Sequence, residues 1–356
     1  MKSRTRLFQV LLSIPTLLIV ATILASLERT PLTGRYVFPA PNCPKISSIR
    51  WRLITLSPEE EEEIASQLAG PGWYNAVGQI LAEDGLTKFI PPNDWRYMWV
   101  NDTLRRLEST IPILVQERAL CPEWLSSDTP MPPPAEYPLR PRPRASEHLR
   151  TFCENLCHRV AAPGPHTIPG PPYSLLVVDK PDSANAFSYG FGPNGGGGVV
   201  VYSGFLDNIF SRYPSVMSPP PEESWLSSFF SLFTVSPPAA HPIPTPEQTS
   251  ELAILLAHEL AHLILSHHLE TLSSGTVFIP GTLSILSDVV RVLLFPVTML
   301  FGPFVNDAVA QLGKVGSGEL IKVGDYCTSI HQEIEADVVS ARYYVNPDLL
   351  SSLTSL

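Results

Sequence analysis

The chain has 356 residues, enough for one large domain or two modest ones, and its formal net charge is −10 at pH 7. This acidic balance argues against nucleic acid as a partner. Charged residues make up only 16% of the chain and apolar residues 44%, a composition that indicates association with a membrane.

The N-terminal residues 1–28 predict a membrane anchor. Residues 7–27 contain no charge and suit one bilayer crossing of about 20 residues. The competing interpretation is a cleaved signal peptide, whose apolar part is usually shorter. The residues before the apolar run include three basic ones, Lys2, Arg4 and Arg6. This basic end is expected on the positive-inside face of the membrane, with the bulk of the chain on the opposite side.

Residues 29–56 are interpreted as a linker, and residues 57–356 as one domain. The domain opens with a helix that begins at Ser57 and ends at residues 70–72, and a second helix is expected near residues 102–108. Three segments rich in proline are predicted to be extended insertions into the domain. They are residues 129–144, 163–172 and 214–246.

Two strands are predicted in the middle of the chain, at residues 173–179 and 199–204. Both are rich in Val, Leu and Tyr and are bounded by residues typical of turns. The glycine-rich run at residues 190–198 contains no phosphate-loop pattern, because no Gly-Lys-Ser/Thr follows it. This run is interpreted as a flexible hairpin connection.

A helix with a strong start signal follows. Thr245 and Gln248 form a capping-box pattern around a proline at the first helical position, and the helix is expected to run to about Gly275. It contains the sequence His-Glu-Leu-Ala-His, which begins at His258. Side chains four residues apart lie about 40° apart around a helix, so His258 and His262 can bind a single zinc ion.

Glu259 lies about 100° around the helix from His258, where it can reach the metal's surroundings without being a ligand. Zinc lowers the pKa of a water molecule that it binds, and Glu259 can take that proton as general base. The alternative is a buried helix with two hydrogen-bonded core histidines. A glutamate between two histidines on an apolar helix is costly to bury without a partner, which favours metal chemistry.

The apolar residues 277–305 are either associated with the membrane or form a helix hairpin buried in the protein, and both interpretations are kept. A further helix begins near His331 and carries three carboxylates, Glu333, Glu335 and Asp337. A catalytic zinc usually needs a third protein ligand. Glu333 and Asp337 share one helix face, so one can bind the metal while the other orients a ligand histidine. Glu335 lies about 200° around the helix from Glu333.

Together these motifs resemble the gluzincin peptidases that include the HtpX heat-shock protease and the CAAX prenyl protease. The resemblance is closest to the Oma-type metalloendopeptidase of the mitochondrial inner membrane, whose activity overlaps that of the m-AAA protease. It rests on the two metal motifs and on three further blocks, residues 31–35, 57–63 and 185–205. The resemblance implies that His258, His262 and Glu333 bind one zinc ion, that Glu259 is the catalytic base, and that Asp337 supports a ligand.

The resemblance also implies an edge strand to which a substrate peptide adds as an extra strand. The residues so assigned are Asn185, Val199, Val200, Val201, Tyr202 and Ser203. It further implies protein quality control in the mitochondrial inner membrane, with membrane proteins as substrates. The chain lacks a long transit peptide rich in Arg and Ser, so the endoplasmic reticulum membrane is kept as the alternative location.

The sequence therefore predicts a membrane-anchored zinc endopeptidase with a mainly helical α+β fold and a small sheet. Its expected partners are protein or peptide substrates and a membrane, and a homo-oligomer is left open. Two alternatives are a catalytically impaired zinc-binding scaffold and a membrane adaptor that acts through the segments rich in proline.

Overall fold

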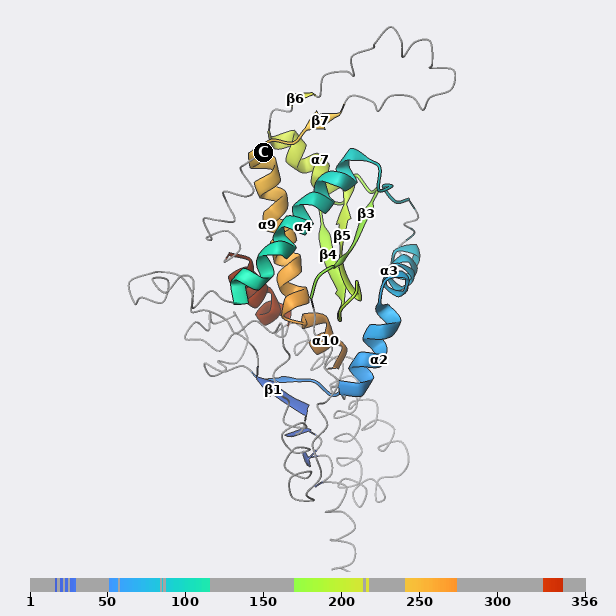
Figure 1. The fold of residues 1–356 in the computed structure, drawn as a ribbon, viewed down its shortest axis with the longest axis vertical. Coiled ribbons are helices and arrows are strands. Elements are labelled where there is room, and N and C mark those ends of the chain that lie inside the picture. Colours follow the sequence, from blue (N-terminus) through green and yellow to red (C-terminus); the bar gives the residue numbers. More distant parts are fainter. Residues whose placement is uncertain are drawn as a thin grey trace, which may run out of the picture.

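The computed structural model describes residues 17, 20, 21, 23, 24, 26–29, 51–56, 58–83, 85, 88–115, 170–213, 216–217, 241–273 and 329–341. In these ranges the fold is mainly helical α+β with small sheets, as predicted (Figure 1). The helices are α2 (Pro58–Leu68), α3 (Pro71–Glu83), α4 (Trp95–Val115), α7 (Ser203–Arg212), α9 (Pro246–Ile264), α10 (His267–Thr271) and one over residues 329–341. The strands are β1 (Leu27–Arg29), β2 (Trp51–Leu53), β3 (Ser174–Val178), β4 (Ala186–Gly190), β5 (Gly197–Tyr202), β6 (Val216–Met217) and β7 (Pro242–Ile243).

Several predicted segments lie outside the described residues. They are most of the anchor and of the linker, the insertion at 129–144, most of the insertions at 163–172 and 214–246, and the apolar segment 277–305. Within the part of the chain that the structure describes, no helix is both long enough and apolar enough to cross a membrane.

The central sheet has the strand order β3-β5-β4. Strands β4 and β5 are antiparallel and are joined through the glycine-rich run, so this run is a hairpin connection as predicted. Strand β4 itself was not predicted, and the two predicted strands, β3 and β5, pair in parallel. The run is buried rather than loose. A Cβ atom on Gly198 would lie 2.5 Å from the Ser174 carbonyl oxygen and 2.6 Å from the Trp73 ring, so glycine is needed here for close packing.

Both faces of this sheet are covered by helices (Figure 1). Val199 and Val201 of β5 pack in the main core with α4 and α9, whereas Val200 packs on the opposite face against Trp73 and Val77 of α3. Successive side chains of a strand point to opposite faces, so β5 has apolar residues on both sides. Every residue of β5 is buried.

This burial corrects the predicted substrate edge. Strand β5 is paired on both sides, with β3 and with β4, and has no free edge for a substrate. A continuous run of Val and Tyr is typical of a central strand covered on both faces. Ser203 belongs to helix α7, where its hydroxyl accepts a hydrogen bond from the Lys180 backbone N–H at 2.9 Å.

Helix α9 begins as predicted. The Gln248 backbone N–H donates to Thr245 Oγ1 at 3.3 Å, and the Thr245 N–H donates to Gln248 Oε1 at 2.8 Å. The predicted end near Gly275 is wrong, because α9 ends at Ile264 and Ser266 adopts the left-handed conformation with φ +55°. The chain then re-enters a short helix, α10, in a new direction.

Arg52 of β2 holds the C-terminal end of α9. Its Nη1 donates to the Leu265 carbonyl at 2.5 Å, and its Nη2 lies 2.9 Å from Glu28 Oε1 of β1. Arg52 and Glu28 are both buried. A cation at the end of a helix interacts favourably with the unpaired carbonyls there.

Helix α4 is longer than the predicted helix at residues 102–108, because it begins at Trp95 and ends at Val115. Asp94 caps the first turn: its Oδ1 accepts from the Arg96 backbone N–H at 2.9 Å, and its Oδ2 lies 2.9 Å from Arg96 Nη2. The hydrogen bonds from Arg96 lower the pKa of Asp94 below its usual value.

Replacing Asp94 with alanine is expected to lower the free energy of unfolding by about 1 kcal/mol at neutral pH, the usual cost of a lost N-cap. A carboxyl group with a lowered pKa in the folded state stabilises the fold above its unfolded pKa, and this contribution is lost as the pH falls through its folded pKa. The difference between the two proteins should therefore shrink below the ordinary value of 3.8. Denaturant unfolding at pH 7 and pH 3 measures it, with Asp102→Ala on the exposed side of the same helix as control. An equal difference at both pH values would contradict the charged cap.

Candidate metal centre

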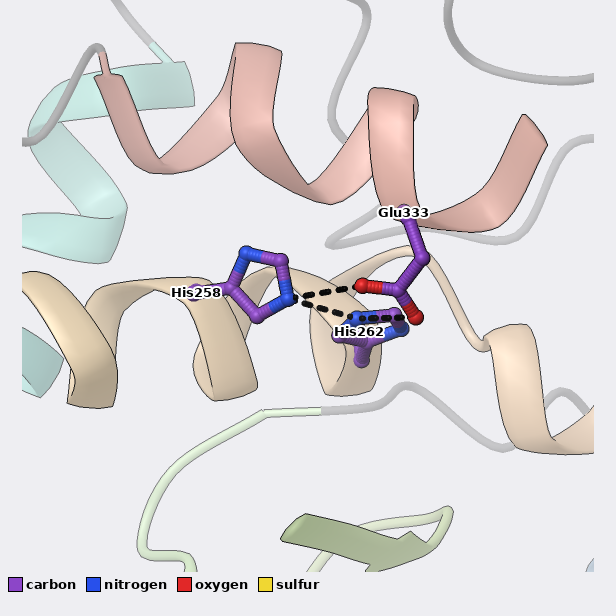
Figure 2. A group of neighbouring side chains, drawn as sticks. All are labelled: His258, His262 and Glu333. Carbon is purple, nitrogen blue, oxygen red and sulfur yellow. Dashed lines mark hydrogen bonds and ion pairs between the residues drawn. The ribbon is translucent and has the colours of Figure 1, made fainter. Parts of the chain in front are cut away.

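The three predicted ligands converge between α9 and the helix at residues 329–341 (Figure 2). His258 Nε2 lies 3.1 Å from His262 Nε2 and 3.1 Å from Glu333 Oε2. His262 Nε2 lies 3.6 Å from Glu333 Oε1. The two histidines point from one face of α9 because they are one turn apart, and Glu333 reaches them from the facing helix.

These separations fit a zinc ion. Zinc binds nitrogen and carboxylate oxygen at about 2.0–2.2 Å in a tetrahedral arrangement, so neighbouring ligand atoms lie about 3.3 Å apart. The three observed separations lie within a few tenths of an ångström of that value. Two histidines and a glutamate also leave a fourth position open, as catalytic zinc sites do.

Each ligand histidine has a partner on its other ring nitrogen. His258 Nδ1 lies 3.0 Å from Asp337 Oδ1, as expected for the supporting carboxylate. His262 Nδ1 lies 2.9 Å from Nδ1 of His267, a buried residue of α10. Such contacts fix the ring orientation and the tautomer of a metal ligand.

Burial is the largest cause that lowers the pKa of His262 from its ordinary value of 6.5 to about 3, and the neighbouring His267 and His258 contribute in the same direction. His262 is therefore neutral at physiological pH. A histidine must be neutral to bind a metal, so this nitrogen needs no deprotonation before the ion binds.

Glu259 of α9 is 8% exposed, and α9 packs beside strand β4. Burial raises the pKa of its carboxyl group above the usual value, while hydrogen bonds from Ser188 of β4 and the proximity of His258 oppose that rise. The nearby Glu333 raises this pKa further. A buried carboxyl group with a raised pKa beside a metal site is typical of a general base.

The structure thus brings His258, His262, Glu333 and Asp337 together and places Glu259 beside them. It does not bring the predicted strand β5 to an exposed edge. Reasoning from the sequence did not predict Ser188, nor the contacts that link Glu335 to His267 and His267 to His262. His267 follows the metal motif in an apolar run, and Ser188 directly follows Asn185-Ala186-Phe187, so both lay next to motifs that were already identified.

Comparison with known proteins agrees with this geometry. The sequence model of peptidase family M48 matches residues 149–354, which is more than half of the chain and includes both helices that form the metal centre. No curated protein and no solved structure matches the chain. The predicted resemblance to HtpX-like gluzincins is confirmed at the level of this family. The chain belongs to peptidase family M48, a family of zinc metallopeptidases.

Proposed function

We propose that the chain is a membrane-anchored zinc endopeptidase that cleaves membrane or membrane-associated proteins. The observation that carries the proposal is the convergence of His258, His262 and Glu333 on one point, with the buried Glu259 beside them. An intact glutamate at this position argues against the alternative of a catalytically impaired scaffold.

The residues of the site have separable tasks. When bound, zinc supplies Lewis-acid chemistry for the hydrolysis of a peptide bond. Glu259 takes a proton from the attacking water and passes it to the leaving amine nitrogen. Ser188 hydrogen-bonds to the Glu259 carboxylate and so orients it. Burial raises the pKa of Glu259 above the usual carboxyl value, which makes the carboxylate a stronger proton acceptor.

Strand β4 is the edge of the central sheet nearest the site. Within the described residues it pairs only with β5 and packs beside α9. The Tyr202 N–H donates to the Asn185 carbonyl at 3.1 Å, and pairing alternates along an antiparallel ladder. The backbone groups of Ala186, Ser188 and Gly190 therefore point away from β5. An extended substrate would add to the sheet along β4, where the peptide backbone lies beside Glu259.

The proposed location is the mitochondrial inner membrane. The uncharged run at residues 7–27 supports an anchor, and the blocks shared with the Oma type support this compartment. The endoplasmic reticulum membrane is the alternative. Carbonate extraction should leave the full chain in the membrane pellet, and protease protection should place the metal domain on the side opposite Met1. Release of the intact chain into the soluble fraction would contradict the anchor.

Removal of the metal tests the activity. The purified full-length chain, in detergent, is expected to hold about one zinc ion and to cleave an unfolded protein internally. A chelator should abolish cleavage, and zinc should restore it where Mg²⁺ does not, because the donor set suits zinc and magnesium prefers oxygen ligands. Metal analysis and mass spectrometry of the products measure both. Cleavage that persists in the metal-free chain would refute the proposed function.

A further inference from the structure

We propose that Glu335 and His267 form a hydrogen-bond chain that fixes His262 in the tautomer able to bind zinc. The inference rests on the metal centre of the proposed function and adds two positioning residues to it. Two contacts in series carry it, Glu335 to His267 and His267 to His262.

The distances define the chain. His267 Nε2 lies 3.2 Å from Glu335 Oε2, and His267 Nδ1 lies 2.9 Å from His262 Nδ1. His267 is 2% exposed and Glu335 is 8% exposed. The remaining ring nitrogen of His262, Nε2, faces His258 and Glu333.

With His267 neutral, the protons can be placed along this hydrogen-bond chain in one consistent way. A carboxylate only accepts hydrogen bonds, so the Glu335 contact requires a proton on His267 Nε2. In a neutral imidazole the other nitrogen, His267 Nδ1, then accepts. His262 Nδ1 must carry the proton that is donated to it, and His262 Nε2 keeps a free lone pair for the metal. The reverse arrangement would place a proton on the metal-facing nitrogen and leave His267 Nε2 without a proton beside the carboxylate.

The break after α9 makes this chain possible. On an unbroken helix residue 267 would lie about 140° around the axis from His262 and would point away from it. The left-handed Ser266 redirects the backbone, so the His267 ring returns beside His262 at a centroid distance of 4.9 Å. Gln332, which directly precedes Glu333 on the facing helix, donates to the His267 carbonyl at 3.5 Å. This contact ties His267 to the helix that carries Glu333 and Glu335, so the hydrogen-bond chain joins the two helices that form the site.

The two ligand histidines are therefore supported differently. His258 has a direct contact to Asp337, whose side chain is 72% exposed. His262 depends on two buried residues in series. Because water can replace an exposed partner more readily than a buried one, loss of the buried chain should weaken zinc binding at least as much as loss of Asp337.

The test compares two replacements of His267 in the full-length chain. Asparagine places an amide oxygen at the branch that Nδ1 occupies and restores an acceptor for His262, whereas leucine fills the space without an acceptor. His267→Leu should weaken zinc binding by about 10–100-fold, the usual effect of losing a group that supports a ligand, and His267→Asn should stay within a few-fold of wild type. A role in packing alone would give the reverse order. Competition with a chelating dye measures the affinity, and the cobalt absorption spectrum reports the ligand geometry.

A second comparison tests whether Glu335 acts on His262 only through His267. Glu335→Ala should weaken zinc binding in the wild-type background and add nothing in the His267→Asn background, because Glu335 acts through His267. Ser329→Ala, an exposed change at the start of the same helix, is the control. Equal affinity for His267→Leu and wild type, or an additive effect of Glu335→Ala, would overturn the inference. If His267→Leu does not fold, the comparison at Glu335 decides alone.

Affinity is measured without substrate, so this result is separate from the proposed function. A wild-type chain that binds zinc but cleaves no protein would refute the peptidase and leave the hydrogen-bond chain standing.

Discussion

Replacement of Glu259 by glutamine is expected to leave zinc bound and to lower peptide hydrolysis by about 10²–10⁴-fold, the range that a lost general base produces. Glutamine has the same shape and can still accept a hydrogen bond from Ser188, but it cannot take a proton from water. The ligands His258, His262 and Glu333 are untouched, so the metal content should not change. Turnover and bound zinc, measured on the same sample, separate the two effects.

Glu247→Gln is the matched control, because it makes the same chemical change on the exposed first turn of the same helix. Near-normal hydrolysis by Glu259→Gln would refute the proposed mechanism. Loss of zinc together with activity would instead show that Glu259 holds the metal.

The second large effect is expected at Glu333. Its two carboxylate oxygens lie 3.1 Å from His258 Nε2 and 3.6 Å from His262 Nε2, so it faces both other ligands. Glu333→Ala should weaken zinc binding by more than the roughly 10–100-fold expected for Asp337→Ala, because it removes a ligand and not a support. Activity should be lost in parallel. Titration of the metal-free variants with zinc measures the difference.

Glu62→Ala, an exposed glutamate of α2, controls for the loss of a carboxylate elsewhere. If Glu333→Ala binds zinc as tightly as wild type, the third ligand is wrongly assigned and must come from another residue.

Local signals in the sequence predicted most of what is local in the structure. The capping box of α9 and the shared face of His258 and His262 depend only on residues within one or two helical turns, and both are found. The mainly helical fold and the strands β3 and β5 were likewise predicted from short patterns, whereas strand β4 was not.

Features that depend on distant segments were not predictable in this way. Strand β5 was assigned as the substrate edge from the family resemblance, although its continuous apolar run is typical of a central strand. Its pairing with β3 and β4 depends on segments outside it. Helical geometry correctly turned Glu335 away from the metal, but it could not show that His267 lies where Glu335 points. That contact exists only because Ser266 ends α9 with a left-handed residue.

The two helices that carry the metal ligands are far apart along the chain, since α9 ends at Ile264 and the other begins at residue 329. An ion held by His262 and Glu333 therefore closes a loop of roughly 70 residues, and a cross-link of that length removes about 4 kcal/mol of chain entropy from the unfolded state. Zinc thus acts as a reversible cross-link between the two helices. Because a ligand that binds only the folded state stabilises it by mass action, the free energy of unfolding should rise with the concentration of free zinc. When zinc is scarce, the protein would then lose its activity and would also be degraded faster, because more of it is unfolded and open to proteases.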